Sequence, residues 1–118
     1  MVIWYTRQVM ETEYQRLDRA ATRAYEIRAA VFKALGHPTR LFIIDRLVAG
    51  ERCVCELAEL INADLSTISK HLSVLRNAGV VTAEKRGARV FYRLRISPDG
   101  ALFGCMSSVA DTLAAGVR

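Results

Sequence analysis

The chain has 118 residues, a length that gives one domain with its own hydrophobic core and leaves no room for a second. A hydrophobic share of 52% excludes a disordered chain, and a formal net charge of +5, from 17 Lys and Arg against 12 Asp and Glu, favours a polyanionic partner such as nucleic acid or an anionic membrane surface. No apolar run is long enough to cross a membrane and no secretory pattern opens the sequence, so we expect a cytoplasmic protein with no membrane-spanning segment.

The region up to Leu35 predicts helix, because it contains no Gly or Pro and its apolar residues recur at helical spacing. A break near residues 20–24 would divide it, so the stretch from about 8 to 35 forms either one long helix or two. Gly36 is the expected C-terminal cap. The apolar face consists of Met10, Tyr14, Leu17, Ala21, Ala24, Val31 and Leu35.

Three shorter helices follow. The first begins at Pro38, where the missing N–H costs nothing, and ends at Ala49-Gly50. The second runs from about Cys53 or Cys55 to Asn62, and the third runs from near Ser66 to Gly79 after a turn at 63–64. The residues expected to face the core are, helix by helix, Leu41, Ile44, Leu47 and Val48; Leu57, Leu60 and Ile61; and Leu65, Ile68, Leu72 and Leu75.

After Gly79 the apolar residues recur every second position, which predicts two strands over 80–85 and 89–96. Gly87 in the turn between them can take a positive φ. On the second strand Val90, Tyr92, Leu94 and Ile96 share one face, and Arg89, Phe91, Arg93 and Arg95 share the other. A last helix is expected to start at Ser97-Pro98-Asp99 and to carry Leu102, Met106, Val109 and Leu113.

Two short helices joined by a tight turn and followed by a hairpin have the order of a winged helix-turn-helix. The predicted fold is therefore mainly α with a β-hairpin, in the order ααααα-ββ-α or αααα-ββ-α. We expect it to form a single domain over residues 1–118.

Hydroxyl and basic side chains gather on the exposed side of the helix over 66–79 and on the hairpin. Short hydroxyls at a helix N-terminus allow close approach to the major groove of DNA. The span 66–95 holds seven Lys and Arg and one acid, Glu84, although a basic run alone is often only a solvated surface. Together with the fold it predicts binding to double-stranded DNA by Ser66, Thr67, Ser69, Lys70, His71, Arg76, Lys85, Arg86 and Arg89.

Three segments carry a family resemblance: ALGHPTRL at 34–41, ERCVCEL at 51–57 and LSTISKHLSVLRNAG at 65–79. They resemble the ArsR/SmtB family of metal-responsive repressors, in particular its arsenic-responsive branch, and the likeness extends from about Val31 to Leu94. It implies a homodimer that binds operator DNA and leaves it when a thiophilic metal or metalloid binds. It also implies that the terminal helices, about 8–35 and 98–116, form the dimer interface.

The three cysteines are an odd number, which argues against a disulfide framework and for free thiols, ligands or buried packing. Cys53 and Cys55 would point to different sides of a regular helix, so both sulfurs reach one ion only where the helix start is frayed or distorted. Soft thiolates select As(III), Sb(III), Cd(II) or Zn(II). With the resemblance, this pair is expected to bind As(III) or Sb(III) as inducer.

The sequence leaves the identity of a third arsenic ligand open. The arsenic-sensing relatives have a third cysteine three residues after the second, where this chain has Ala58. Cys105 either completes the site, from the same or the partner protomer, or is a small buried residue of the dimer helix. A methylated arsenical would need only two thiolates. The Asp/His zinc site of other family members is not expected, because no His follows His71.

Two other kinds of regulator, and an enzyme, are the alternatives to an arsenic-responsive repressor. The pair with further ligands would suit a repressor that senses Cd(II), Pb(II) or Zn(II), and a disulfide involving Cys105 would suit a thiol redox sensor. We do not expect an enzyme, because the sequence shows no nucleophile–base pair and no phosphate-binding loop.

Overall fold

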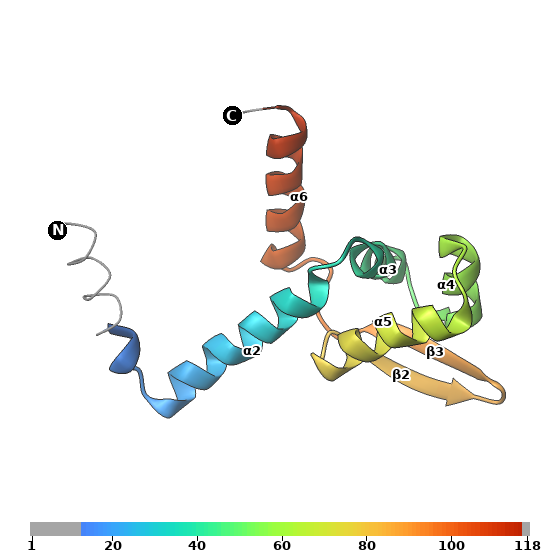
Figure 1. Ribbon diagram of the computed structural model, residues 1–118, viewed down its shortest axis with the longest axis horizontal. Helices are drawn as coiled ribbons and strands as arrows, with labels where there is room; N and C mark the ends of the chain where they lie inside the picture. The colour runs from blue at the N-terminus through green and yellow to red at the C-terminus, as the bar shows by residue number, and fades with distance from the viewer. Residues whose placement is uncertain (1–12, 117–118) are drawn as a thin grey trace.

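The computed structural model describes residues 13–116, and Met10 of the predicted apolar face lies outside them. Its helices and strands are α2 (Arg19–Leu35), α3 (Pro38–Val48), β1 (Arg52–Cys53), α4 (Val54–Ile61), α5 (Leu65–Asn77), β2 (Val81–Arg86), β3 (Arg89–Leu94) and α6 (Ala101–Ala114) (Figure 1). Helices α4 and α5 form the helix-turn-helix, and β2 and β3 form the wing. The predicted class, a mainly helical winged helix-turn-helix, is confirmed.

The break in the N-terminal helical region comes earlier than expected. Helix α2 starts after Asp18, whose carboxylate accepts a hydrogen bond from the Ala21 N–H at 2.8 Å. An aspartate cap stabilises a helix start, so the chain breaks there and not near residues 20–24. Only Ala34 and Leu35, at the end of α2, are buried.

The buried side of α3 is shifted from the predicted one. The His37 ring caps this helix, with Nδ1 accepting from the Thr39 N–H at 3.1 Å. The core side carries Ile43, Ile44 and Leu47, whereas the expected core residues Leu41 and Val48 are 38% and 44% exposed. They lie at the edges of the apolar stripe, because each residue turns the helix by about 100°.

Helix α5 packs on the core through Ile68, Leu72 and Leu75, which are fully buried as predicted. Leu65, also predicted to be buried, is 56% exposed because the first turn of α5 borders a cavity shared with the wing. In α4 the buried pair is Leu57 and Ala58, and the predicted core residue Leu60 is 50% exposed. Asn62 ends α4 in the left-handed conformation, with a φ of 56°.

The sheet has three antiparallel strands in the order β1-β3-β2, one more strand than the sequence analysis expected. The additional strand, β1, pairs Arg52 with Tyr92 and Cys53 with Phe91. Gly87 lies in the wing turn with a φ of 63°, as expected. The predicted inner face of β3 is confirmed, because Tyr92 is buried and Val90 and Leu94 pack against the core. The strand ends at Leu94, two residues earlier than predicted, and Ile96 packs against the core from the segment after it.

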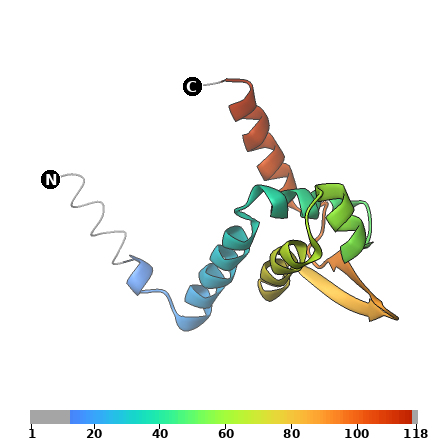
Figure 2. The ribbon, with the colours of Figure 1, turned by 45° about the vertical axis from the view of Figure 1, so that its right-hand side comes forward.

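Helix α6 starts at Ala101, three residues later than predicted. The Ser97 hydroxyl accepts from the Asp99 N–H and the Ser97 carbonyl from the Gly100 N–H, so these residues close a separate turn before the helix. No residue of α6 is buried. Figures 1 and 2 show α2 and α6 extending away from the body that the other elements form. Within residues 13–116 no helix has the length and apolar character needed to span a membrane.

Candidate nucleic-acid interface and thiol site

The solvent side of α5 carries most of the residues expected to contact DNA. Ser66, Thr67, Ser69, Lys70 and Arg76 are all exposed. The helix presents its hydroxyls in the first turn and its basic side chains further along. This arrangement fits a helix that enters a major groove by its N-terminal half.

Asp64 fixes the start of α5. Its carboxylate accepts from the Thr67 N–H at 3.0 Å and from the Ser66 hydroxyl at 3.3 Å. The hydrogen bonds from Thr67, with a smaller one from Ser66, hold the pKa of Asp64 below its ordinary value. The sequence analysis treated Asp64 only as part of a turn, although an Asp directly before a helical pattern is a typical capping signal.

His71 lies differently from the other residues expected at the interface. It is half-buried on α5, and its ring packs on that of His37, with 4.7 Å between the centroids. Burial, together with the charges of His37 and Arg40, lowers the pKa of His71. The ring is therefore neutral near pH 7 and offers a polar contact rather than a positive charge.

The wing carries three of the expected DNA-binding residues, Lys85, Arg86 and Arg89, all exposed. Arg86 differs from the other two because its guanidinium is paired with Glu51 and Glu84. Neither carboxylate was singled out as a partner from the sequence, and a contact over 35 positions, such as Arg86 to Glu51, leaves no local pattern.

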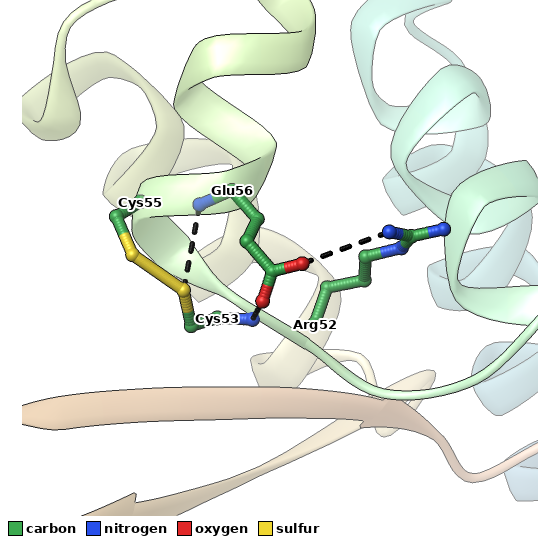
Figure 3. The surroundings of a disulfide bond; sticks show 4 residues. All are labelled: Arg52, Cys53, Cys55 and Glu56. Atoms are coloured by element: carbon green, nitrogen blue, oxygen red, sulfur yellow. Dashed lines mark hydrogen bonds and ion pairs between the residues drawn. A yellow bond between two sulfur atoms is a disulfide. The ribbon is translucent and has the colours of Figure 1, made fainter.

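The cysteine pair lies where β1 meets α4. Cys53 and Cys55 form a disulfide with 5.5 Å between their Cα atoms, so the expectation of free thiols is wrong for this structure (Figure 3). The two sulfurs meet because Cys53 has extended backbone, with a ψ of 159°, and lies just outside the helix. Cys53 is 1% exposed and Cys55 is exposed.

Cys53 is also the cap of α4. Its Sγ accepts from the Glu56 N–H at 3.4 Å, and the Glu56 carboxylate accepts from the Cys53 N–H at 3.2 Å. Arg52 pairs with the same carboxylate at 3.6 Å (Figure 3). The sulfur of Cys53 and the first turn of α4 are therefore held by one set of contacts.

A cavity of about 320 Å³ lies beside the disulfide. It is bordered by the start of α4, the first turns of α5 and the wing, and its lining consists of Cys53, Val54, Cys55, Leu65, Ser69, Ala88, Arg89 and Val90. The cavity therefore lies between the cysteine pair and the two elements that are expected to contact DNA.

Cys105, the third candidate ligand, is a free and exposed cysteine of α6. Its exposure in the single chain leaves open the alternative in which Cys105 is buried in a dimer interface. Among residues 13–116 no three His, Cys, Asp or Glu side chains are close enough to hold a metal ion, so the chain by itself does not bring Cys105 to the cysteine pair.

Fold and site together define a winged helix-turn-helix regulator. A family model described as "Bacterial regulatory protein, arsR family" matches residues 37–83. An uncharacterized HTH-type transcriptional regulator of Methanocaldococcus jannaschii is 45% identical over 69 residues, which cover 58% of this chain and 78% of that protein. A cadmium resistance transcriptional regulatory protein CadC homolog of Staphylococcus aureus is 43% identical over 56% of this chain and 55% of its own length.

Solved structures agree. The homodimeric winged helix-turn-helix DNA-binding domain of a possible ArsR-family regulator from Mycobacterium bovis has a TM-score of 0.74 and 31% identity, covering 87% of this chain and 95% of that one. The chain belongs to the ArsR/SmtB family of transcriptional regulators. It spans less than half the length of two mycobacterial relatives, 41% and 47%.

Proposed function

We propose that this chain binds operator DNA as a homodimer and releases it when As(III) or Sb(III) binds the thiolates of Cys53 and Cys55. One observation carries the proposal: Cys53 caps α4, and both cysteines border a cavity that α5 and the wing also line. A ligand at the sulfurs therefore acts directly on the elements that would contact DNA.

The docking part of the proposal rests on charge and exposure. The exposed hydroxyls and Lys70 of α5 would enter the major groove, and the wing would contact the flanking backbone. Six of the seven basic residues between positions 66 and 95, all except the paired Arg86, would neutralise phosphates there, namely Lys70, Arg76, Lys85, Arg89, Arg93 and Arg95.

The dimer part rests on apolar surface that the single chain leaves uncovered. Helix α6 has no buried residue, and α2 buries only its last turn. Exposed on these helices are Tyr25, Ile27, Phe32, Val109 and Leu113. Apolar stripes on both terminal helices are best covered by the same helices of a second copy, related by a two-fold axis.

The switch part begins with the reduced pair. Each thiol forms a sulfur–arsenic bond in place of one arsenic–hydroxyl bond, and its proton leaves with that hydroxyl as water. The Sγ of Cys53 then has less electron density to accept the hydrogen bond from the Glu56 N–H. The start of α4 shifts, and the filled cavity changes the distance between α5 and the wing. Such coupling between two sites is typically worth about 1–3 kcal/mol, or about 5- to 150-fold in DNA affinity.

Trivalent arsenic takes three ligands, and Cys53 and Cys55 supply only two of them. We assign the third to Cys105 of the partner protomer or to an organic substituent on the arsenic itself. Cys105→Ser separates the two: loss of the response to arsenite with a retained response to methylarsenite supports the thiol, and an unchanged response to both supports two-thiolate binding.

Two other effectors each have an observation in their favour. The similarity to a cadmium resistance regulator favours Cd(II), and the disulfide favours an oxidation switch at the same sulfurs. Both alternatives keep the same DNA docking and the same dimer, and they differ from the proposal only in the species that reacts with Cys53 and Cys55.

One titration tests these effectors against each other. A fluorescent duplex, selected by the reduced protein from a random-sequence library, is followed by anisotropy during addition of arsenite, antimonite, Cd(II) or diamide. Release by arsenite or antimonite at stoichiometric amounts supports the proposal. Release by Cd(II) or diamide, with arsenite and antimonite inert, would overturn it in favour of the corresponding alternative.

A further inference from the structure

Arg86, the last residue of β2, has three partners, one on its own strand and two across the sheet. Its Nη2 donates to the Glu51 carboxylate at 2.9 Å and to the Glu84 carboxylate at 2.8 Å, and its Nη1 donates to the other Glu51 oxygen. Its guanidinium also lies over the Phe91 ring, 4.8 Å from the centroid. A planar, two-pronged contact of this kind requires arginine.

These partners belong to three different strands or their ends. Glu84 lies on β2 itself, Phe91 lies on the central strand β3, and Glu51 directly precedes β1 at the opposite edge. Glu84 and Phe91 are register partners, and Phe91 also faces Cys53. The Arg86 side chain thus crosses the central strand and joins the wing to the segment that leads into the cysteine pair.

The charge balance leaves little of the Arg86 charge for a phosphate. The Arg86 guanidinium is paired with both carboxylates, and its hydrogen bonds, with a smaller effect of the Arg93 charge, hold the pKa values of Glu51 and Glu84 below their ordinary range. Both carboxylates are therefore ionised near neutral pH. By contrast, Lys85 and Arg89 make no ion pair with any residue between 13 and 116.

We propose that Arg86 is a positioning residue that clamps the wing to the β1 segment, and that it affects DNA affinity through the placement of the wing and not as a phosphate contact. This inference rests on the proposed docking to DNA. It differs from the sequence-based expectation, which grouped Arg86 with Lys85 and Arg89 as direct contacts.

Glu51 and Glu84 give a matched pair of variants. Each substitution to glutamine removes one negative charge and one ion pair with Arg86, but only Glu51→Gln breaks the link between β1 and β2. Electrostatics alone predicts that both variants bind DNA more tightly. The clamp predicts that Glu51→Gln weakens binding about two- to fivefold, while Glu84→Gln leaves it unchanged or tighter.

The second comparison uses Arg86 itself. Arg86→Lys keeps the charge and loses the two-pronged geometry, so a clamp predicts weaker binding by about the same factor, with an unchanged slope of log K against log salt. Arg89→Ala, as the reference for a phosphate contact, should lower that slope by about one.

The measurement is anisotropy of a selected duplex at several salt concentrations, with thermal unfolding of each variant as a check on folding. Three results would overturn the clamp. Glu51→Gln could bind DNA more tightly, or both glutamine variants could weaken binding equally. Arg86 could also behave as a phosphate contact, with native affinity and salt slope for Arg86→Lys but a lower slope for Arg86→Ala. Failure of the wild-type protein to select any duplex would instead overturn the proposed docking.

Discussion

Cys53 and Glu56 cap each other at the start of α4, because the cysteine sulfur accepts from the Glu56 N–H and the glutamate accepts from the Cys53 N–H. The proposed effector site and the cap of a helix are therefore the same atom. A thiophilic ligand that takes the Sγ of Cys53 competes with the hydrogen bond that starts α4, and α4 is the first half of the helix-turn-helix.

Serine at either position of the pair should uncouple DNA binding from release. Serine is itself a good helix cap, so Cys53→Ser should keep the fold and the DNA affinity, within about 1 kcal/mol of the wild-type stability. Cys53→Ser and Cys55→Ser should each abolish the arsenite-induced loss of affinity, because a single thiolate cannot chelate. Anisotropy titration of the reduced variants measures both quantities, and a fully inducible Cys55→Ser would refute the site.

Single basic residues of α5 and the wing should contribute separately to DNA affinity. Lys70→Ala and Arg89→Ala should each weaken binding and flatten the salt dependence by about one unit of slope, because each removes one phosphate contact. Arg46→Ala, on α3, removes the same charge outside α5 and the wing and should leave the slope unchanged. Equal slopes for all four proteins would contradict the docking.

The stability of the protein should fall below pH 6.5 because of His71. Its pKa is lowered from 6.5 in the folded chain, so the unfolded chain binds a proton first as the pH falls. The free energy of unfolding therefore decreases from the ordinary pKa down to the lowered one. Urea unfolding at about pH 8 and about pH 5 should show a smaller decrease for His71→Gln than for the wild type. An identical decrease in both proteins would argue against this origin.

The exposed leucine near the end of α6 should control dimerisation. Leu113 is 68% exposed in the single chain, so Leu113→Asp would place a charge in the proposed interface. We expect the dimer dissociation constant to rise about tenfold or more, with a parallel loss of DNA affinity. Sedimentation velocity measures the first effect. Leu60→Asp, on α4 and 50% exposed, is the control and should stay dimeric.

The spacing of apolar residues and the residue types in the turns predicted the helix-turn-helix and the wing. The fully buried Ile68, Leu72 and Leu75 repeat at helical spacing, and Gly87 was placed correctly in the wing turn. These features depend on residues that are close in sequence, where backbone preferences act directly.

The features that the sequence did not predict depend on contacts between residues that are far apart in the chain. Strand β1 has two residues, too few for any periodicity, and it exists only because β3 pairs with it. Leu65 fits the apolar pattern of α5, but it borders a cavity and is exposed. The apolar residues of α2 and α6 recur as they do on helices that face a core, yet the single chain leaves most of them unburied. The contact of Arg86 with Glu51 likewise has no local signal.

The absence of buried residues in α6 has a consequence for how repression depends on protein abundance. If the cover of this helix comes only from a second copy, the DNA-binding species forms in proportion to the square of the monomer concentration wherever the protein is mostly monomeric. Operator occupancy would then rise steeply over a narrow range of expression. The amount of protein in the cell, and not only the effector concentration, would then determine when the operator becomes unoccupied.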